Sequence, residues 1–142
     1  TDDAGAASLR GEARFGTVET FGLHEGADWQ ATDVEPSAAA TAFTVVHAGQ
    51  PLGRVVLPMT GLHNVRNALA ALAVGASRDV PFATMVDALA RFTGVKRRME
   101  LRGTAHGVAV YDDFAHHPTA IAETLRGVRR AHPESRVWAI FE

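Results

Sequence analysis

A chain of 142 residues is long enough for one ordinary domain or for two incomplete ones. Its composition, 46% hydrophobic and 21% charged, is typical of a soluble globular protein, and a net charge of -2 predicts neither a nucleic acid nor a membrane partner. Zero cysteines exclude disulfides and cysteine-ligated zinc, and the absence of a signal peptide or of an apolar run of roughly 18 residues predicts a cytoplasmic protein.

The first part of the chain predicts a mostly antiparallel β segment over residues 15–59. Its expected strands are short and rich in valine, threonine or aromatic residues, and the loop "EPSAAAT" interrupts them. A hairpin with its turn at Gly49-Gln50-Pro51 is expected in the second half of the segment. The expected strands are "GTVETFG" (16–22), "DWQATDVE" (28–35), 42–48 and 52–57.

Two helices are predicted next. "NVRNALAALAVGAS" (64–77) has apolar residues at helical spacing, with Asn64 as a plausible cap and Gly75 to Ser77 as a plausible stop. "VPFATMVDALARF" (80–92) follows, with Pro81 in its first turn and an apolar face. We expect the two helices to pack as a pair against the preceding sheet, through Val65, Leu69, Leu72, Ala73, Phe82, Met85, Val86 and Leu89.

The basic link "TGVKRR" (93–98) is the candidate domain boundary. Beyond it, two strands joined at His106-Gly107, then a helix and an apolar last strand, predict a parallel crossover that begins a doubly wound sheet. Such a strand needs cover on both faces, which this short stretch does not supply, so we expect a fragment of a longer protein. The expected elements are 99–105, 108–114, 118–131 and "RVWAIFE" (136–142).

The loop "YDDFAHHPT" carries the densest group of polar side chains. Ligands of open α/β sheets bind at the carboxyl ends of strands, where Asp113, His116 and His117 would lie, and a helix beginning at Pro118 attracts anions. A carboxylate can accept hydrogen bonds from ribose hydroxyls, and imidazoles can donate to phosphates. A simple turn with helix caps, a nucleotide or substrate pocket, and a metal site all fit these residues.

Two further groups point to the same kind of ligand. In "GLHNVRNALAAL", Asn64 and Asn67 are three residues apart beside His63, and an asparagine amide matches the edge of an adenine ring. Helix capping by Asn64 and solvent exposure of Asn67 form the alternative. In "KRRMELRG", four basic residues are either a solvated link or the source of a phosphate contact, namely Lys96, Arg97, Arg98 and Arg102.

These three groups, in this order, resemble the Mur ligase family of ATP-dependent amide-forming enzymes of peptidoglycan synthesis. "TGLHNVRNALAALAVG" resembles the last helix of the central ATPase domain, "GVKRRMELRG" the entry to the carboxy-terminal domain, and "YDDFAHHPTAI" the strand and loop that follow. The resemblance implies an α/β fold. Residues 1–94 would be the C-terminal part of the central ATP-binding domain, and residues 95–142 the start of a Rossmann-like α/β carboxy-terminal domain.

The resemblance also implies roles for single residues. His63, Asn64 and Asn67 would lie at the adenine of ATP, Arg98 would approach the phosphates, and Asp113 would hold the ribose. His116 and His117 would be the catalytic residues on the acyl-phosphate side of the cleft. The family's magnesium ligands lie upstream of this segment, so no residue here is assigned to a metal. The phosphate-binding loop GxxGK[ST] is missing from the chain, so these 142 residues alone are expected to be inactive.

Two branches of the family that use UDP-N-acetylmuramate are the nearest. Phe114-Ala115 in "DDFAHHPT" resembles the branch that attaches the tripeptide L-Ala-γ-D-Glu-meso-diaminopimelate in peptidoglycan recycling, since the L-alanine-adding branch tends to have tyrosine-glycine there. The resemblance therefore predicts a fragment of the tripeptide ligase, with ATP and Mg²⁺ as cofactors and an acyl phosphate as intermediate. The UDP-N-acetylmuramate–L-alanine ligase and a non-catalytic nucleotide-binding module are the alternatives.

Overall fold

The computed structural model describes residue 5 and residues 8–12, 16–37 and 39–140. After a short 3-10 helix (η1, Leu9–Glu12), a four-stranded sheet has the order β1-β2-β3-β4. Strand β1 runs parallel to β2, and the other neighbours are antiparallel. The sheet is therefore mostly antiparallel, as predicted, although its first strand is shorter than expected. The strands are β1 (Phe21–Gly22), β2 (Trp29–Pro36), β3 (Thr41–His47) and β4 (Gln50–Leu57).

The hairpin between β3 and β4 turns one residue earlier than predicted. Ala48 and Gly49 form the turn, with φ angles of 48° and 77°, and two consecutive positive φ angles are the mark of a two-residue type I′ turn. Pro51 consequently lies inside β4, opposite Val46, where the pairing register shifts. Proline has no N–H for the ladder, and β4 tolerates it because it is an edge strand.

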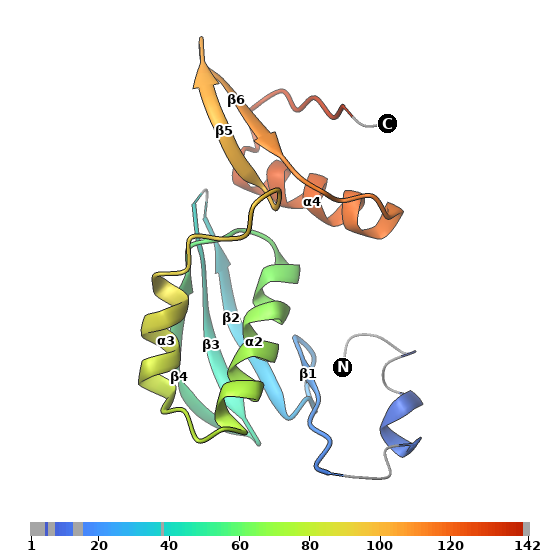
Figure 1. The fold of residues 1–142 in the computed structure, drawn as a ribbon, viewed down its shortest axis with the longest axis vertical. Helices are drawn as coiled ribbons and strands as arrows, with labels where there is room; N and C mark the ends of the chain where they lie inside the picture. Colours follow the sequence, from blue (N-terminus) through green and yellow to red (C-terminus); the bar gives the residue numbers. More distant parts are fainter. Residues whose placement is uncertain (1–4, 6–7, 13–15, 38, 141–142) are drawn as a thin grey trace.

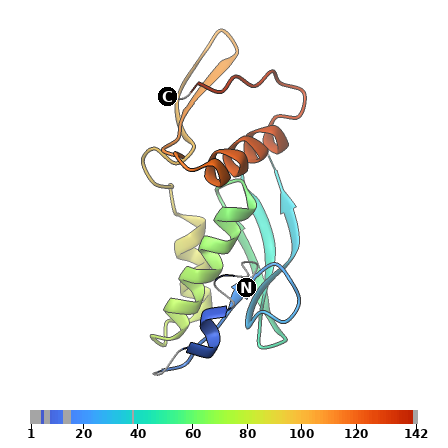
Figure 2. The same cartoon turned by 90° about the vertical axis from the view of Figure 1, so that its right-hand side faces the viewer.

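Two helices cover one face of this sheet, as Figures 1 and 2 show from two directions. Helix α2 (Leu62–Ala76) begins two residues earlier than predicted, with Gly61 at its N-cap position, so the expected cap at Asn64 is wrong. Its end before Ser77 is as predicted. Helix α3 (Phe82–Ala90) has Pro81 at the N-cap, one position before the first turn.

The hydrophobic core lies between this helix pair and the sheet. Trp29 and Phe43 from the strands pack with Leu69 and Leu72 from α2, and all four are at most 1% exposed. The predicted apolar faces of both helices are confirmed, because their remaining members are buried in this cluster or packed against it. Burial at roughly 25 cal/mol per Å² of apolar surface makes this cluster the main source of stability in the molecule.

The second unit is a hairpin and a helix. Strands β5 (Glu100–Ala105) and β6 (Val108–Asp112) pair antiparallel around the predicted turn at His106-Gly107, and α4 (Pro118–Ala131) follows. The predicted strand 136–142 is wrong over residues 136–140, and residues 141–142 lie outside the described part of the chain. A strand needs a neighbour for its ladder, and here no described strand pairs with this segment, which leaves Trp138 79% and Ile140 96% exposed.

Helix α4 joins the two units. In Figures 1 and 2 it lies across the upper end of α2, beneath the β5–β6 hairpin. The contact is made by glycines, since a Cβ on Gly127 of α4 would come within 4.0 Å of the Cα of Gly61. The whole is an α/β fold, as expected. None of the helices in the described part of the chain is long and apolar enough to span a bilayer.

Candidate functional site

The start of α2 presents His63 and Asn64 to the second unit. Gly61 has a φ of 95°, and the ring of His63 packs directly over it, because a Cβ there would be 2.8 Å from the His63 Cε1. Asn64 is only 8% exposed, and its Nδ2 donates a hydrogen bond to the Thr60 carbonyl at 2.8 Å. The Asn64 Oδ1 is left as an acceptor that a ligand can use.

His63 is neutral near pH 7 and has an unused ring nitrogen. Its Nδ1 is buried and has no hydrogen-bond partner among the described residues. Burial lowers the pKa of His63 below its ordinary value of 6.5, while the carboxylates of Glu123 and Asp113 oppose the shift and the guanidinium groups of Arg98 and Arg66 add to it. A buried polar atom without a partner costs free energy of folding, which a hydrogen bond to water or to a ligand hydroxyl would recover.

Asp113 follows strand β6 directly, and its carboxylate contacts three segments. Its Oδ2 accepts the backbone N–H of Met99 at 2.9 Å, and its Oδ1 accepts the N–H of Ala115 at 2.8 Å and the hydroxyl of Thr124 at 3.5 Å. The turn-forming role that the sequence left open is therefore present. An ionised carboxylate offers about four acceptor positions, so about one remains for a ligand.

The two adjacent histidines have different local roles. His117 is the N-cap of α4, where its Nδ1 accepts the N–H of Thr119 at 3.4 Å. The Nδ1 of His116 lies 3.1 Å from the Phe114 carbonyl, and its ring lies 5.1 Å from the ring of Phe114. Both histidines are exposed, so neither is held by burial. Both residues directly precede the first turn of α4, where backbone amides lack intrahelical partners.

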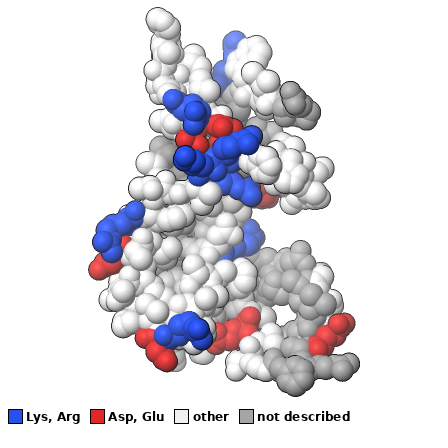
Figure 3. All heavy atoms as spheres, viewed as in Figure 1, with Lys and Arg blue, Asp and Glu red and all other residues white. Residues whose placement is uncertain are grey.

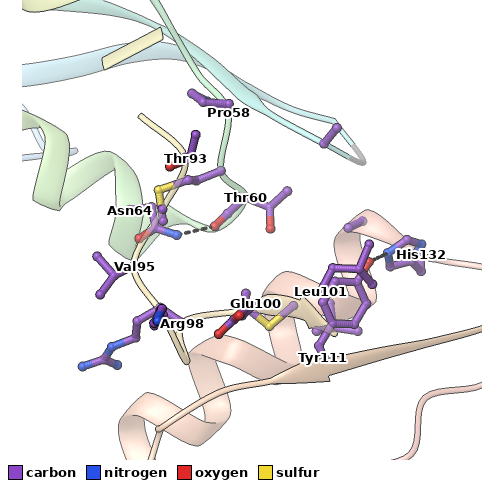
Figure 4. A pocket seen from close by; sticks show the side chains of 17 residues that line it. Pro58, Thr60, Asn64, Thr93, Val95, Arg98, Glu100, Leu101, Tyr111 and His132 are labelled. Carbon is purple, nitrogen blue, oxygen red and sulfur yellow. Dashed lines mark hydrogen bonds between the residues drawn. The ribbon is translucent and has the colours of Figure 1, made fainter. Parts of the chain in front are cut away.

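A cavity of about 600 Å³ lies between the two units (Figure 4). Asn64 and Thr60 line it from the start of α2, Arg98 from the link, Glu100 from the start of β5, and Tyr111 and His132 from the opposite side. The Tyr111 hydroxyl lies 3.4 Å from the His132 Nε2. The guanidinium of Arg98 points away from these two rings, at the edge of the cavity. This volume is in the range of small-molecule sites, typically about 300–1,000 Å³.

The structure brings some of the predicted residues together and leaves others apart. His63 lies within electrostatic range of both Arg98 and Asp113, but of these three residues only Arg98 lines the cavity. Asn67 is exposed and does not line the cavity, although the three-residue spacing placed it on the face of Asn64. Tyr111, His132 and Glu123 were not singled out by the sequence. Of these three, only Tyr111 could have been chosen from the sequence, because it directly precedes Asp112 and Asp113 in the polar loop motif.

Charged side chains of both signs gather at this joint, as Figure 3 shows. The link and the second unit contribute three ion pairs, Arg97–Asp112 at 3.7 Å, Arg102–Glu100 at 2.9 Å and Arg126–Glu123 at 2.6 Å. Across residues 16–37 and 39–140, no group of three or more potential metal ligands comes together.

Comparison with known protein families accounts for most of the chain. The Mur ligase middle domain matches residues 1–75, and the "Mur ligase, glutamate ligase domain" matches residues 97–142. The chain belongs to the Mur ligase family. The family assignment made from "GLHNVRNALAAL", "VKRRMELRG" and "YDDFAHHPTAI" is thus confirmed.

The chain is similar to UDP-N-acetylmuramate–L-alanine ligases. It is 46% identical over 123 residues to the one from Desulfatibacillum aliphaticivorans, a match that covers 87% of this chain and 27% of the relative. Among solved structures, the UDP-N-acetylmuramate–alanine ligase of Thermotoga maritima matches with a TM-score of 0.75 at 29% identity, over 82% of this chain and 27% of that one. The chain spans about a quarter of the length of these relatives.

A structure from the tripeptide branch is also similar. The murein peptide ligase of Psychrobacter arcticus is 39% identical, with a TM-score of 0.50, over 82% of this chain and 24% of that one. The curated relative favours the L-alanine-adding branch, whereas Phe114-Ala115 favours the tripeptide branch. Two residues of a surface loop were too small a basis for that preference.

Proposed function

We propose that the chain is the joint between the central and carboxy-terminal domains of an ATP-dependent ligase that joins L-alanine to UDP-N-acetylmuramate. The domain boundary in this proposal falls between Gly94 and Val95. The observation that carries it is the cavity of about 600 Å³, which is lined by a buried asparagine from one unit and by the basic link and second unit on the other side. Such a reaction, which consumes ATP, takes place in the cytoplasm.

The residues at the start of α2 fit the adenosine part of ATP. Asn64 offers its Oδ1 to an amino group such as that of adenine, while the bond from its Nδ2 to Thr60 fixes the amide orientation. The remaining acceptor position of Asp113 can bind a ribose hydroxyl, and the neutral His63 lies beside Asn64 with its Nδ1 buried. Asn67, being exposed, contributes at the rim of this site.

The link and the α4 loop fit the phosphate side. Arg98 lies at the cavity edge, where a guanidinium can bind phosphate oxygens in a bidentate manner. His116 and His117 lie beside the N-terminus of α4, whose free amides favour an anion, and can donate hydrogen bonds to the acyl phosphate. ATP supplies the phosphoryl group that activates the muramoyl carboxylate, and the chain's own residues bind and orient the reacting groups.

The magnesium ion and the glycine-rich phosphate loop of this proposal belong to parts of the ligase outside these 142 residues. The chain contains no GxxGK[ST] sequence, and among residues 16–37 and 39–140 no cluster of metal ligands forms. No step of the reaction is therefore assigned to a metal ligand here.

The test is ligation by the longer protein that carries this chain. With ATP, Mg²⁺ and UDP-N-acetylmuramate present, L-alanine is expected to be ligated in preference to L-Ala-γ-D-Glu-meso-diaminopimelate, with release of ADP. Asn64→Ala should raise the KM for ATP by about tenfold, because a desolvated hydrogen bond to the ligand is worth about 1.5 kcal/mol. If neither amine is ligated while ATP still binds, the non-catalytic nucleotide-binding module takes the place of the ligase.

The tripeptide ligase of peptidoglycan recycling is the second candidate. It is supported by the 39% identity to the murein peptide ligase of Psychrobacter arcticus and by Phe114-Ala115. Phe114 is exposed and lies under the Arg97 guanidinium, 4.8 Å from it, so this pair offers an apolar and cationic surface to a larger peptide. Preference for the tripeptide in the same assay would favour the tripeptide ligase over the L-alanine ligase.

A further inference from the structure

The backbone on either side of Arg98 is in a conformation that L residues seldom adopt. Arg97 has a φ of 58° and Met99 a φ of 51°, and neither is glycine. Left-handed residues of this kind are disfavoured by the clash of Cβ with the backbone, so they persist only where neighbouring contacts hold them. Two such residues separated by one arginine require two sets of holding contacts.

A carboxylate provides each set. The Glu100 Oε2 accepts the N–H of Arg97 at 2.9 Å, and the Asp113 Oδ2 accepts the N–H of Met99 at 2.9 Å. The carbonyl of Arg97 in turn accepts the N–H of Phe114 at 2.7 Å. The backbone is thus fixed immediately before and after Arg98, from β5 on one side and from the end of β6 on the other.

Glu100 is itself held in place. Its other oxygen, Oε1, accepts a hydrogen bond from Arg102 Nη1 at 2.9 Å, so both oxygens are engaged. The Arg97 N–H is the main cause that lowers the pKa of Glu100 below 4.5, and Arg102 adds to it. Glu100 is therefore ionised at neutral pH, the state in which it is the stronger acceptor.

We propose that Glu100 is a positioning residue that holds Arg98 at the edge of the interdomain cavity, in the orientation that binds the phosphates of the nucleotide. The inference rests on the proposed function, because the phosphate contact of Arg98 is part of that function. Glu100 contacts no ligand in this role and acts through the backbone of Arg97. From the start of β5, Glu100 holds the backbone before Arg98, as Asp113 just after β6 holds the backbone after it.

The first test needs no ligand and uses amide hydrogen exchange by NMR on the 142-residue chain. Glu100→Ala should speed exchange of the Arg97 amide by about tenfold, since a charge-assisted bond is lost. Glu100→Gln keeps an acceptor oxygen and should change the rate by less than about threefold. Arg102→Ala, the matched control, removes the other partner of Glu100 and should also stay within about threefold. An unchanged Arg97 rate in Glu100→Ala overturns the proposal.

The second test is a double-mutant cycle on ATP affinity in the longer protein. Arg98→Ala is expected to weaken ATP binding by about tenfold and Glu100→Ala by about fivefold, while the double variant should equal Arg98→Ala, because Glu100 acts only through Arg98. If the losses of ATP affinity in the two single variants multiply in the double variant, the positioning role of Glu100 is overturned, while the phosphate contact of Arg98 stands. ATP binding that is insensitive to Arg98→Ala would overturn the phosphate contact in the proposed function, and with it the inference.

Discussion

Residues 21–90 enclose a core around Trp29, Phe43 and Leu69, whereas among residues 97–140 only Gly127 is buried. The first unit has a sheet with a helix layer packed on it, so apolar burial fixes its shape. The second unit has one two-stranded hairpin and one helix, and polar contacts fix its place: the Asp113 and Glu100 carboxylates hold the link. Apolar burial thus stabilises the first unit, whereas hydrogen bonds and ion pairs stabilise the second.

The largest effect is expected in the core of the first unit. Phe43→Ala should lower the free energy of unfolding by about 3–5 kcal/mol, because it leaves a cavity in a fully buried site. Leu101→Ala, at a site that is 54% exposed in β5, is the control and should change it by less than about 0.5 kcal/mol. Denaturant unfolding measures both. Equal losses would mean that the second unit packs as tightly as the first.

The next effect is expected where the two units touch. Gly61→Ala forces a positive φ of 95° on alanine and brings a Cβ within 2.8 Å of the His63 ring, so a loss of about 1–3 kcal/mol is expected. Gly103→Ala meets nothing within 4 Å and should lose less than about 1 kcal/mol. Thermal unfolding compares the two. A harmless Gly61→Ala would show that the α2 start does not need this close approach.

Removal of one carboxylate should loosen the second unit and spare the first. Asp113→Ala removes the acceptor of three hydrogen bonds, from Met99, Ala115 and Thr124. Because the carboxylate is partly exposed, the free energy of unfolding should fall by only about 1–2 kcal/mol. Amide exchange should rise at Met99 and Ala115 but not in β3. Asp112→Ala removes only a 3.7 Å ion pair and is the matched control. Faster exchange throughout β3 would contradict the division into two differently held units.

The smallest effect is a pH dependence at the joint. Because burial lowers the pKa of His63, the folded state binds its proton less readily than the unfolded state does. Its contribution to stability is therefore complete above pH 6.5 and is lost as the pH falls through the lowered pKa. His63→Gln should remove this part of the pH profile, measured by unfolding from pH 5 to 8. If the stability of His63→Gln depends on pH as the wild type does, another titratable group causes the dependence.

The sequence predicted the first unit well because its signals are local. The apolar spacing of both helices and the paired strands follow from side-chain periodicity, and the family motifs identified the class of protein. The strand expected at 136–142 failed for the opposite reason, since an apolar run forms a strand only beside a partner that supplies hydrogen bonds. Asn64 was misjudged as a cap because the helix start depends on Gly61, whose φ is not visible in the sequence.

For the candidate site, the sequence named residues but not their partners. His63, Arg98 and Asp113 were chosen from three separate motifs, and the fold brings Arg98 and Asp113 within electrostatic range of His63. Glu100, Tyr111 and His132 line the cavity together with Arg98, yet they come from the start of β5, from β6 and from the C-cap of α4, which only tertiary packing brings together. The exposure of Asn67 depends on which face of α2 meets the second unit.

The two tryptophans give each unit its own optical reporter. Trp29 is 1% exposed in the core of the first unit, stacked on the His47 ring at 4.1 Å, whereas Trp138 is 79% exposed after α4. An indole in water emits at longer wavelength than one in an apolar core, and a dissolved quencher such as iodide reaches only the hydrated one. The unlabelled wild-type chain therefore separates core unfolding from events around its last segment in a single fluorescence spectrum.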